Sequence, residues 1–95
     1  MPAYVIADIT INDQDVYAEY RKQVPATVAR HGGKFVVRGG PHERLEGEWR
    51  PGRVVVIEFP DMAAARAWYA STEYTPLIKL RQSASSGSVI LVEGA

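Results

Sequence analysis

The sequence predicts an α+β fold with the element order βαββαβ, and three observations support this prediction. Four segments are rich in β-branched and aromatic residues, as strands are, and they span residues 3–11, 34–38, 53–59 and 88–94. Two helix-forming segments separate them, each preceded by an aspartate suited to capping a helix. The length of 95 residues fits one domain, so we expect a single domain over residues 1–95.

The first strand and helix have clear boundaries in the sequence. Residues 3–11 read AYVIADITI and predict a strand, after which Asn12 and Asp13 supply a turn and a helix cap. The helix that follows carries a stripe of apolar residues at helical spacing, namely Tyr17, Tyr20, Val24 and Val28. Pro25 lies within the stripe and predicts a kink or the start of a second helical piece, because proline lacks an amide donor. His31-Gly32-Gly33 ends the helix, with a glycine able to adopt the left-handed conformation.

The middle of the chain predicts a pair of strands with an irregular connection. Residues 34–38 (KFVVR) form the second strand, which residues 39–41 (GGP) interrupt. Residues 42–46 (HERLE) are expected to resume it after a bulge or bend, and residues 47–52 (GEWRPG) form the turn of the hairpin. Residues 53–59 (RVVVIEF) are the third strand.

The second helical region is predicted to consist of two pieces. Pro60-Asp61 ends the third strand and caps a helix whose larger residues gather on one side, namely Met62, Ala65, Trp68 and Tyr69. Ser71 or Thr72 caps a second piece, with Pro76 in its first turn, where a missing amide hydrogen costs little. Leu77, Ile78 and Arg81 follow Tyr74 along this piece.

The last strand completes the predicted arrangement. Residues 82–87 (QSASSG) are expected to be a flexible linker, and residues 88–94 (SVILVEG) the final strand. This order is the ferredoxin-like one, which is a four-stranded antiparallel sheet with its helices on one face.

The composition indicates which kinds of partner, metal ion and cofactor the protein is not expected to bind. Eleven basic and eleven acidic residues balance, so the chain has no strong attraction for phosphate, and we expect no nucleic acid partner. Cysteine is absent and only two histidines are present, so we expect neither a disulfide nor a metal site. The glycines lack the spacing of a phosphate loop and no serine occupies a hydrolase elbow, so no cofactor is expected.

The N-terminal segment indicates where the protein resides. The stretch MPAYVIADI lacks the charged leader and the long apolar run of a signal peptide. No apolar run approaches the length needed to span a membrane. We therefore expect a cytoplasmic protein with no membrane partner.

The predicted strands are apolar on both faces. Residues 54–57 (VVVI), 5–7 (VIA) and 90–92 (ILV) show no alternation of apolar and polar residues. Two helices cover only one face of the sheet, and the other would expose an apolar patch that monomers seldom tolerate. We expect a homodimer in which two such faces pack together as a barrel. The alternative is that β-propensity alone produces these runs.

Two charged residues lie in the apolar strands. If the strands alternate regularly, Arg38 and Glu58 both face the open side of the sheet, and Asp8 shares that face. A mostly apolar cavity with a few convergent polar groups is typical of small-molecule sites. We therefore expect a ligand site there, although an Arg38–Glu58 pair could instead fix the hairpin register. A bulge near the glycines that follow Arg38 would change this alternation.

Two further residues are candidates for the ligand site. Histidine has a suitable pKa for proton transfer, and His42 lies four residues beyond Arg38, although an exposed loop histidine is the favoured alternative. Tyr74 offers a phenol to a ligand, although aromatic residues at helical spacing are more often part of the core.

The sequence also resembles a known family. The stretches HGGKFVVRGG, LEG, RVVVIEFP and AWYASTEYTPLIKLR are similar to those of the uncharacterised family called domain of unknown function 1330. This family lies in the dimeric α+β-barrel superfamily, so the resemblance implies a ferredoxin-like protomer and a dimer, but no established activity. The matching positions are Arg38, Gly39, Gly40, Glu58, Phe59, Pro60, Trp68, Tyr69, Ser71, Tyr74 and Arg81.

The sequence supports a binding function more than any particular reaction. We expect a protein that binds a small, partly apolar organic molecule between its strands and a dimer partner. Superfamily relatives range from cofactor-independent monooxygenases to ligand-sensing domains, so fold alone does not transfer chemistry. A cofactor-independent enzyme, a non-catalytic ligand sensor and a structural dimerisation module therefore stay open as alternatives.

Overall fold

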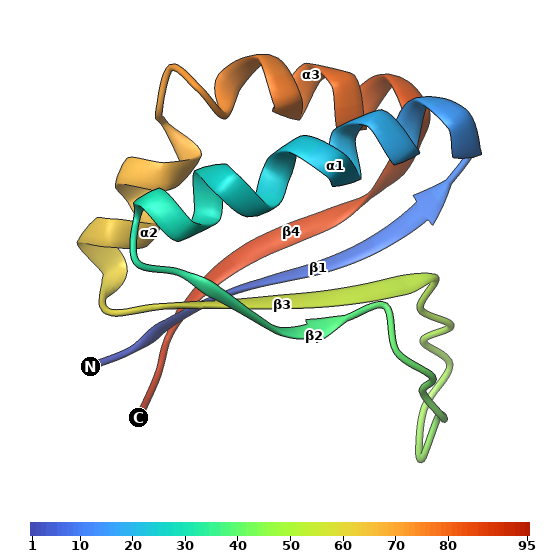
Figure 1. Cartoon of the computed structure of the whole chain (residues 1–95). Helices are drawn as coiled ribbons and strands as arrows, with labels where there is room; N and C mark the ends of the chain where they lie inside the picture. The colour runs from blue at the N-terminus through green and yellow to red at the C-terminus, as the bar shows by residue number, and fades with distance from the viewer.

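A computed structural model describes residues 1–95 and confirms the ferredoxin-like α+β arrangement (Figure 1). The sheet is antiparallel, with the strand order β2-β3-β1-β4. The helices lie together on one face of the sheet, and the loop between β2 and β3 extends on the opposite side. The elements are β1 (Ala3–Ile11), α1 (Gln14–Arg30), β2 (Lys34–Arg38), β3 (Arg53–Phe59), α2 (Met62–Tyr69), α3 (Thr75–Ala84) and β4 (Ser85–Glu93).

Both predicted aspartate caps are present. The side chain of Asp13 accepts a hydrogen bond from the Val16 amide at 3.1 Å, and Asp61 accepts one from the Ala64 amide at 2.8 Å. Each bond satisfies one of the amide donors that a helix leaves unpaired at its start. Gly32 ends α1 with φ at +74°, which confirms the left-handed glycine.

Helix α1 does not break at Pro25, as the sequence had suggested it could. It runs for 17 residues with the proline inside it. Val24 and Val28, one on each side of the proline, are 3% and 1% exposed. Burial of both side chains in the core stabilises the helix and offsets the lost hydrogen bond.

Two sequence-based predictions of irregular structure are wrong. Residues 42–46 do not resume β2, because they belong to an exposed loop in which no strand pairs with them. Residues 82–87 are not a linker, because α3 continues to Ala84 and β4 begins at Ser85. The carbonyl of Ala84 accepts hydrogen bonds from the Asn12 and Asp13 amides, so tertiary contacts order a segment whose composition favours a loop.

The second helical region forms two pieces, as predicted. The Ser71 hydroxyl accepts a hydrogen bond from the Tyr74 amide at 3.2 Å, and the Thr75 hydroxyl donates to the Ser71 carbonyl at 2.8 Å. Ser71 thus orders the turn that precedes α3, and Pro76 lies in the first turn of that helix.

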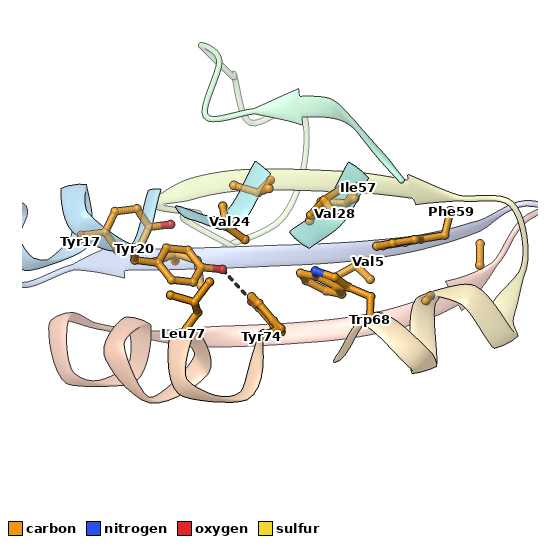
Figure 2. Packing of buried hydrophobic residues seen from close by; sticks show 14 of the residues in the cluster. Val5, Tyr17, Tyr20, Val24, Val28, Ile57, Phe59, Trp68, Tyr74 and Leu77 are labelled. Carbon is orange, nitrogen blue, oxygen red and sulfur yellow. Dashed lines mark hydrogen bonds between the residues drawn. The ribbon is translucent and has the colours of Figure 1, made fainter. Parts of the chain in front are cut away.

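The core lies between the sheet and the helices and is centred on Trp68 (Figure 2). The Trp68 ring stacks on Tyr74 at 4.0 Å between centroids and packs near Phe59 at 5.3 Å. Its indole nitrogen donates a hydrogen bond to the Thr27 hydroxyl at 2.9 Å, so the polar atom of the ring is satisfied inside the core. This single side chain links α2 with α1, α3 and β3.

The irregularity of the β2–β3 hairpin lies within β2. Phe35 pairs with Ile57, but Val37 pairs with Val56, so the register shifts between Phe35 and Val37. One extra residue, Val36, thus interrupts the alternation of β2 before Arg38. A shift of one residue moves every later side chain to the other face of the sheet.

The face of the sheet opposite the helices is apolar and partly exposed. By register it carries Tyr4, Ile6, Val37, Val54, Val56, Ile90 and Val92. Ile90 is 54% exposed and Val92 is 42% exposed, while Val5 and Ile57 on the helix side are nearly covered. We name these seven residues the open face. No helix in the chain combines the length and apolar character required to cross a membrane.

Candidate functional site

A cavity of about 40 Å³ lies between the helices and the sheet. This exceeds the roughly 10–15 Å³ that one water molecule needs but is far below the roughly 300–1,000 Å³ of typical ligand sites, so a ring-bearing ligand enters only as the wall opens. Of its 16 lining residues, 12 are hydrophobic, including Tyr17, Tyr20, Trp68 and Tyr74, and the other four are Arg21, Arg38, Arg53 and Arg81. The cavity is therefore apolar over most of its wall, with guanidinium groups as its charged component.

The bulge in β2 brings Arg38 into this cavity. Arg38 pairs with Val55, whose side chain faces the helices, so Arg38 faces the helices too. Its guanidinium carbon lies 4.4 Å from the centre of the Phe35 ring. This cation–π contact holds an exposed arginine over the apolar wall.

None of the four cavity arginines forms an ion pair. The ion pairs of the chain involve Lys22, Arg30, His31 and Lys34 as the basic partners. Arg81 is only 8% exposed, and the Nε atom of Arg53 is buried with no hydrogen-bond partner. Guanidinium groups keep their charge in proteins, so this wall presents positive charge that no side-chain carboxylate balances.

Gly39 makes room for the Arg53 side chain. It has φ at +71°, and a Cβ atom there would lie within 2.6 Å of the guanidinium carbon of Arg53. Any other residue would both strain the backbone and displace the guanidinium. The RGG stretch at the end of β2 thus positions one cavity arginine, Arg38, and leaves space for a second, Arg53.

Two tyrosines form a buried pair at the cavity wall (Figure 2). The hydroxyls of Tyr20 and Tyr74 lie 2.7 Å apart. Burial, and then the neighbouring Tyr74, raise the pKa of Tyr20 far above its ordinary value, while Arg81 opposes this. Burial raises the pKa of Tyr74 as well, although its contacts with Tyr20 and Arg81 lower it. Both phenols are therefore protonated at neutral pH and act as hydrogen-bonding groups.

The cavity wall contains no histidine, aspartate, glutamate or cysteine. Its protein groups can hold an oxygen anion through the arginines, donate hydrogen bonds through the phenols, and contact an apolar body through the remaining side chains. Side chains that remove a proton near pH 7 are absent from the wall, so binding and orientation are the chemistry that it performs directly.

The structure separates the five predicted site residues. Arg38 and Tyr74 line the cavity, but Asp8 and Glu58 belong to the opposite face, so the predicted convergence of Arg38 with Glu58 is wrong. The reason is the bulge at Val36, which reverses the direction of Arg38. His42 lies in the exposed loop, beside Arg44 and Trp49, away from the cavity.

The two acidic residues have structural contacts instead. Glu58 accepts a hydrogen bond from the Tyr4 hydroxyl at 3.2 Å and lies 3.6 Å from the Lys34 amine. The bond from Tyr4 to Glu58 raises the pKa of that phenol. Asp8 accepts hydrogen bonds from the Trp49 indole and the Gly52 amide, both at 2.8 Å. Asp8 therefore anchors the β2–β3 loop to β1.

Sequence reasoning missed Arg21, Arg53, Tyr20 and Trp68 as cavity residues and left the role of Arg81 open. Two of these arginines could have been found from their spacing. Arg53 alternates with Val55 and so shares its face of β3. Arg81 lies seven residues beyond Tyr74, on the same side of α3.

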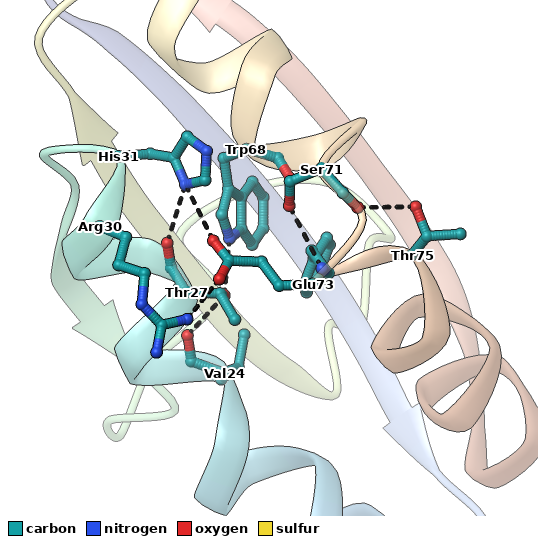
Figure 3. Close-up of polar contacts among 9 residues, drawn as sticks. Val24, Thr27, Arg30, His31, Trp68, Ser71, Glu73 and Thr75 are labelled. Atoms are coloured by element: carbon teal, nitrogen blue, oxygen red, sulfur yellow. Dashed lines mark hydrogen bonds and ion pairs between the residues drawn. The ribbon is translucent and has the colours of Figure 1, made fainter.

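A polar cluster fixes the end of α1 against the turn between α2 and α3 (Figure 3). Glu73 pairs with Arg30 and lies 3.6 Å from the imidazole of His31, whose Nδ1 also contacts the Thr27 carbonyl at 3.0 Å. Thr27 accepts the Trp68 indole hydrogen bond as well. These contacts fix the end of α1 relative to α2 and to the turn that precedes α3, and all three helices line the cavity.

The chain is a ferredoxin-like α+β protein with an apolar, arginine-lined cavity between its helices and its sheet. Residues 2–95 match the domain of unknown function DUF1330, and the chain belongs to that family. No curated protein matches the chain.

Solved structures share the fold at low sequence identity. A protein of unknown function from Rhodopseudomonas palustris, RPA0582, has a TM-score of 0.81 and 21% identity over 99% of this chain and 82% of that one. SnoaB, a cofactor-independent oxygenase from Streptomyces nogalater, has a TM-score of 0.67 and 18% identity over 99% and 93%. An antibiotic biosynthesis monooxygenase has a TM-score of 0.57 and 15% identity over 100% and 99%.

Proposed function

We propose that this protein binds a small, partly apolar organic molecule in the cavity between its helices and its sheet. The observation that carries the proposal is the wall itself, which is apolar and aromatic over most of its area and contains four arginines without ion pairs. The site lies inside one protomer, not between the strands and a dimer partner as the sequence had suggested.

Filling the cavity should abolish binding. Val24 lines the cavity from α1, and Val24→Phe places a ring in the empty space. Phenol and benzoate should raise the melting temperature of the wild-type protein and leave that of the variant unchanged, measured by differential scanning fluorimetry. Ala26→Phe adds the same ring at an exposed position on the same helix, so it should respond as the wild type does.

Native mass spectrometry of the freshly purified protein would identify a natural ligand that remains bound. A wild-type protein that carries no small molecule and responds to neither probe would contradict the proposal. Equal probe binding by Val24→Phe would place the site elsewhere.

A cofactor-independent enzyme is the second candidate function, favoured by the fold shared with the oxygenase SnoaB. Because the cavity wall offers no base near neutral pH, such a reaction would depend on acidity of the ligand itself. Incubating the co-purified molecule with the protein in air and following its mass distinguishes the candidates. Turnover favours the enzyme, and an unchanged, bound molecule favours a ligand sensor.

The open face supports a homodimer. Its residues are largely apolar, no helix covers them, and Val37, Ile90 and Val92 are 40%, 54% and 42% exposed. The β2–β3 loop extends on the same side of the sheet, where a second copy would contact it (Figure 1). Packing two open faces together buries both patches by a symmetric contact.

A charge on the open face should dissociate the dimer. Wild-type protein should scatter light as a particle of about 21 kDa, twice the chain mass of 10.5 kDa. Val56→Asp would bury a carboxylate against apolar residues and should give the mass of one chain at the same concentration, with a helical circular dichroism spectrum. Ala63→Asp, on the exposed side of α2, should remain dimeric. A monomeric wild-type protein would refute the dimer.

A further inference from the structure

The four arginines of the cavity wall differ in how deeply they are buried. Arg21 and Arg38 are exposed, Arg53 is partly buried, and Arg81 is 8% exposed. The four come from α1, β2, β3 and α3, so different elements of the fold direct their guanidinium groups to one space. No carboxylate is paired with the buried members, and Arg81 contacts the Tyr74 phenol instead.

In the ligand-free protein, the buried arginine side chains remain charged, and burying a charge is unfavourable. A buried lysine or histidine can lose its proton and become neutral, but a guanidinium keeps its charge throughout the pH range of folded proteins. The Nε donor of Arg53 is buried and lacks a hydrogen-bond partner. A buried donor without a partner destabilises the folded protein. An anion that enters the cavity would satisfy this donor and balance the charge of Arg81.

We infer that the ligand of this cavity is an organic anion, with an oxyanion held by the arginines and an apolar, ring-bearing body held by the aromatic wall. This inference rests on the proposed binding function and specifies the class of ligand. Guanidinium groups match the planar oxygen pair of a carboxylate and also bind a phenolate oxygen. Trp68 and Tyr74 already stack on each other at 4.0 Å, so the apolar contact for the ring comes from the rest of the wall, which includes Phe35.

A matched series of one-ring probes tests the charge of the ligand. Isothermal titration calorimetry with benzoate, benzamide and benzylammonium compares an anion, a neutral molecule of the same shape and a cation. Benzoate should bind at least about tenfold more tightly than benzamide, because charged hydrogen bonds are stronger than neutral ones, and benzylammonium should not bind. Benzamide binding as tightly as benzoate would overturn the inference while leaving the proposed function intact, whereas no binding by any probe would remove both.

Two further probes identify the source of the negative charge. The affinity for 4-nitrophenol is measured at a pH below and a pH above the pKa of this probe. The comparison reports whether the phenolate is bound in preference to the phenol. Sulfate alone reports whether any anion suffices. Sulfate binding as tight as that of benzoate would show a general anion site and would contradict the assignment of an organic ligand.

Substitution of Arg81 separates ligand binding from folding. Arg81→Met keeps the length and apolar stem of the side chain but removes the buried charge, so the ligand-free variant should melt at the same temperature as the wild type or higher. Its affinity for benzoate should fall about tenfold or more, while its affinity for benzamide stays the same. Arg44→Met, in the exposed β2–β3 loop, is the matched control and should change neither property.

If Arg81→Met fails to fold, Arg53→Met provides the same test from β3. Loss of the benzoate preference in either folded variant supports the inference. Retention of the full preference by both variants would show that the arginines do not hold the anion and would overturn it.

Discussion

Replacing Trp68 by alanine should lower the free energy of unfolding by about 3–5 kcal/mol, the range for truncating a buried large aromatic residue. Trp68 is 1% exposed, stacks on Tyr74, packs near Phe59, and donates its indole hydrogen to Thr27. The alanine variant would leave a cavity at the point where α2 meets α1, α3 and β3. It would also leave the buried Thr27 hydroxyl without its donor.

A loss of this size is large for a chain of 95 residues, whose total stability is expected to be roughly 5–14 kcal/mol. Urea unfolding followed by circular dichroism should show a lower midpoint with little change in slope. Trp49→Ala is the matched control, because Trp49 is 62% exposed and makes one hydrogen bond, to Asp8. It should cost less than about 1 kcal/mol, and equal losses for the two tryptophans would contradict the packing described here.

Features fixed by local physical chemistry were predictable from the sequence. The aspartate caps of α1 and α2 depend on side chains that reach amides three residues ahead, so a short stretch of sequence specifies them. The strand positions follow from apolar, β-branched runs too long to be loops. These local signals were sufficient to order the elements, and the order restricts the topology to a ferredoxin-like sheet.

The candidate site was only partly predictable, because its geometry depends on one bulge. Nothing in KFVVR marks Val36 as the extra residue, since the stretch contains neither glycine nor proline. The glycines that did suggest a bulge follow Arg38, where a bulge could not have reversed that side chain. One shift in register moved Arg38 from the open face to the cavity and left Glu58 with Tyr4 and Lys34.

Tertiary contacts also overrode composition at residues 82–87. Serines and glycine favour a turn, yet α3 continues to Ala84 and Ser85 pairs with Ile11 at the start of β4. Ser85 is 9% exposed, and its hydroxyl donates to the Arg81 carbonyl at 2.6 Å. That bond satisfies a carbonyl at the end of α3, so polar residues serve here as a helix-to-strand junction.

The Tyr20–Tyr74 pair should make the protein lose stability steeply in alkaline solution. Both phenols have a raised pKa in the folded state, chiefly because they are buried. Below pH 10 the folded and unfolded chains both keep these protons, and the stability is fully present. Above pH 10 the unfolded chain releases them first, so the free energy of unfolding should fall by about 1.4 kcal/mol per pH unit for each phenol, until the pH reaches the folded-state pKa.

Tyr20→Phe should weaken this pH dependence by about 1.4 kcal/mol per pH unit, because one of the two phenols is gone. Below pH 10 the variant should be less stable than the wild type by about 1 kcal/mol, since Tyr74 loses its hydroxyl partner at 2.7 Å. Val24→Ala is the control, because it destabilises the same core without removing a phenol, and its curve should run parallel to that of the wild type. Urea unfolding from neutral to alkaline pH measures all three curves. Parallel curves for wild type and Tyr20→Phe would show that the buried phenol ionises as readily in the folded protein as in water, which its burial against Tyr74 forbids.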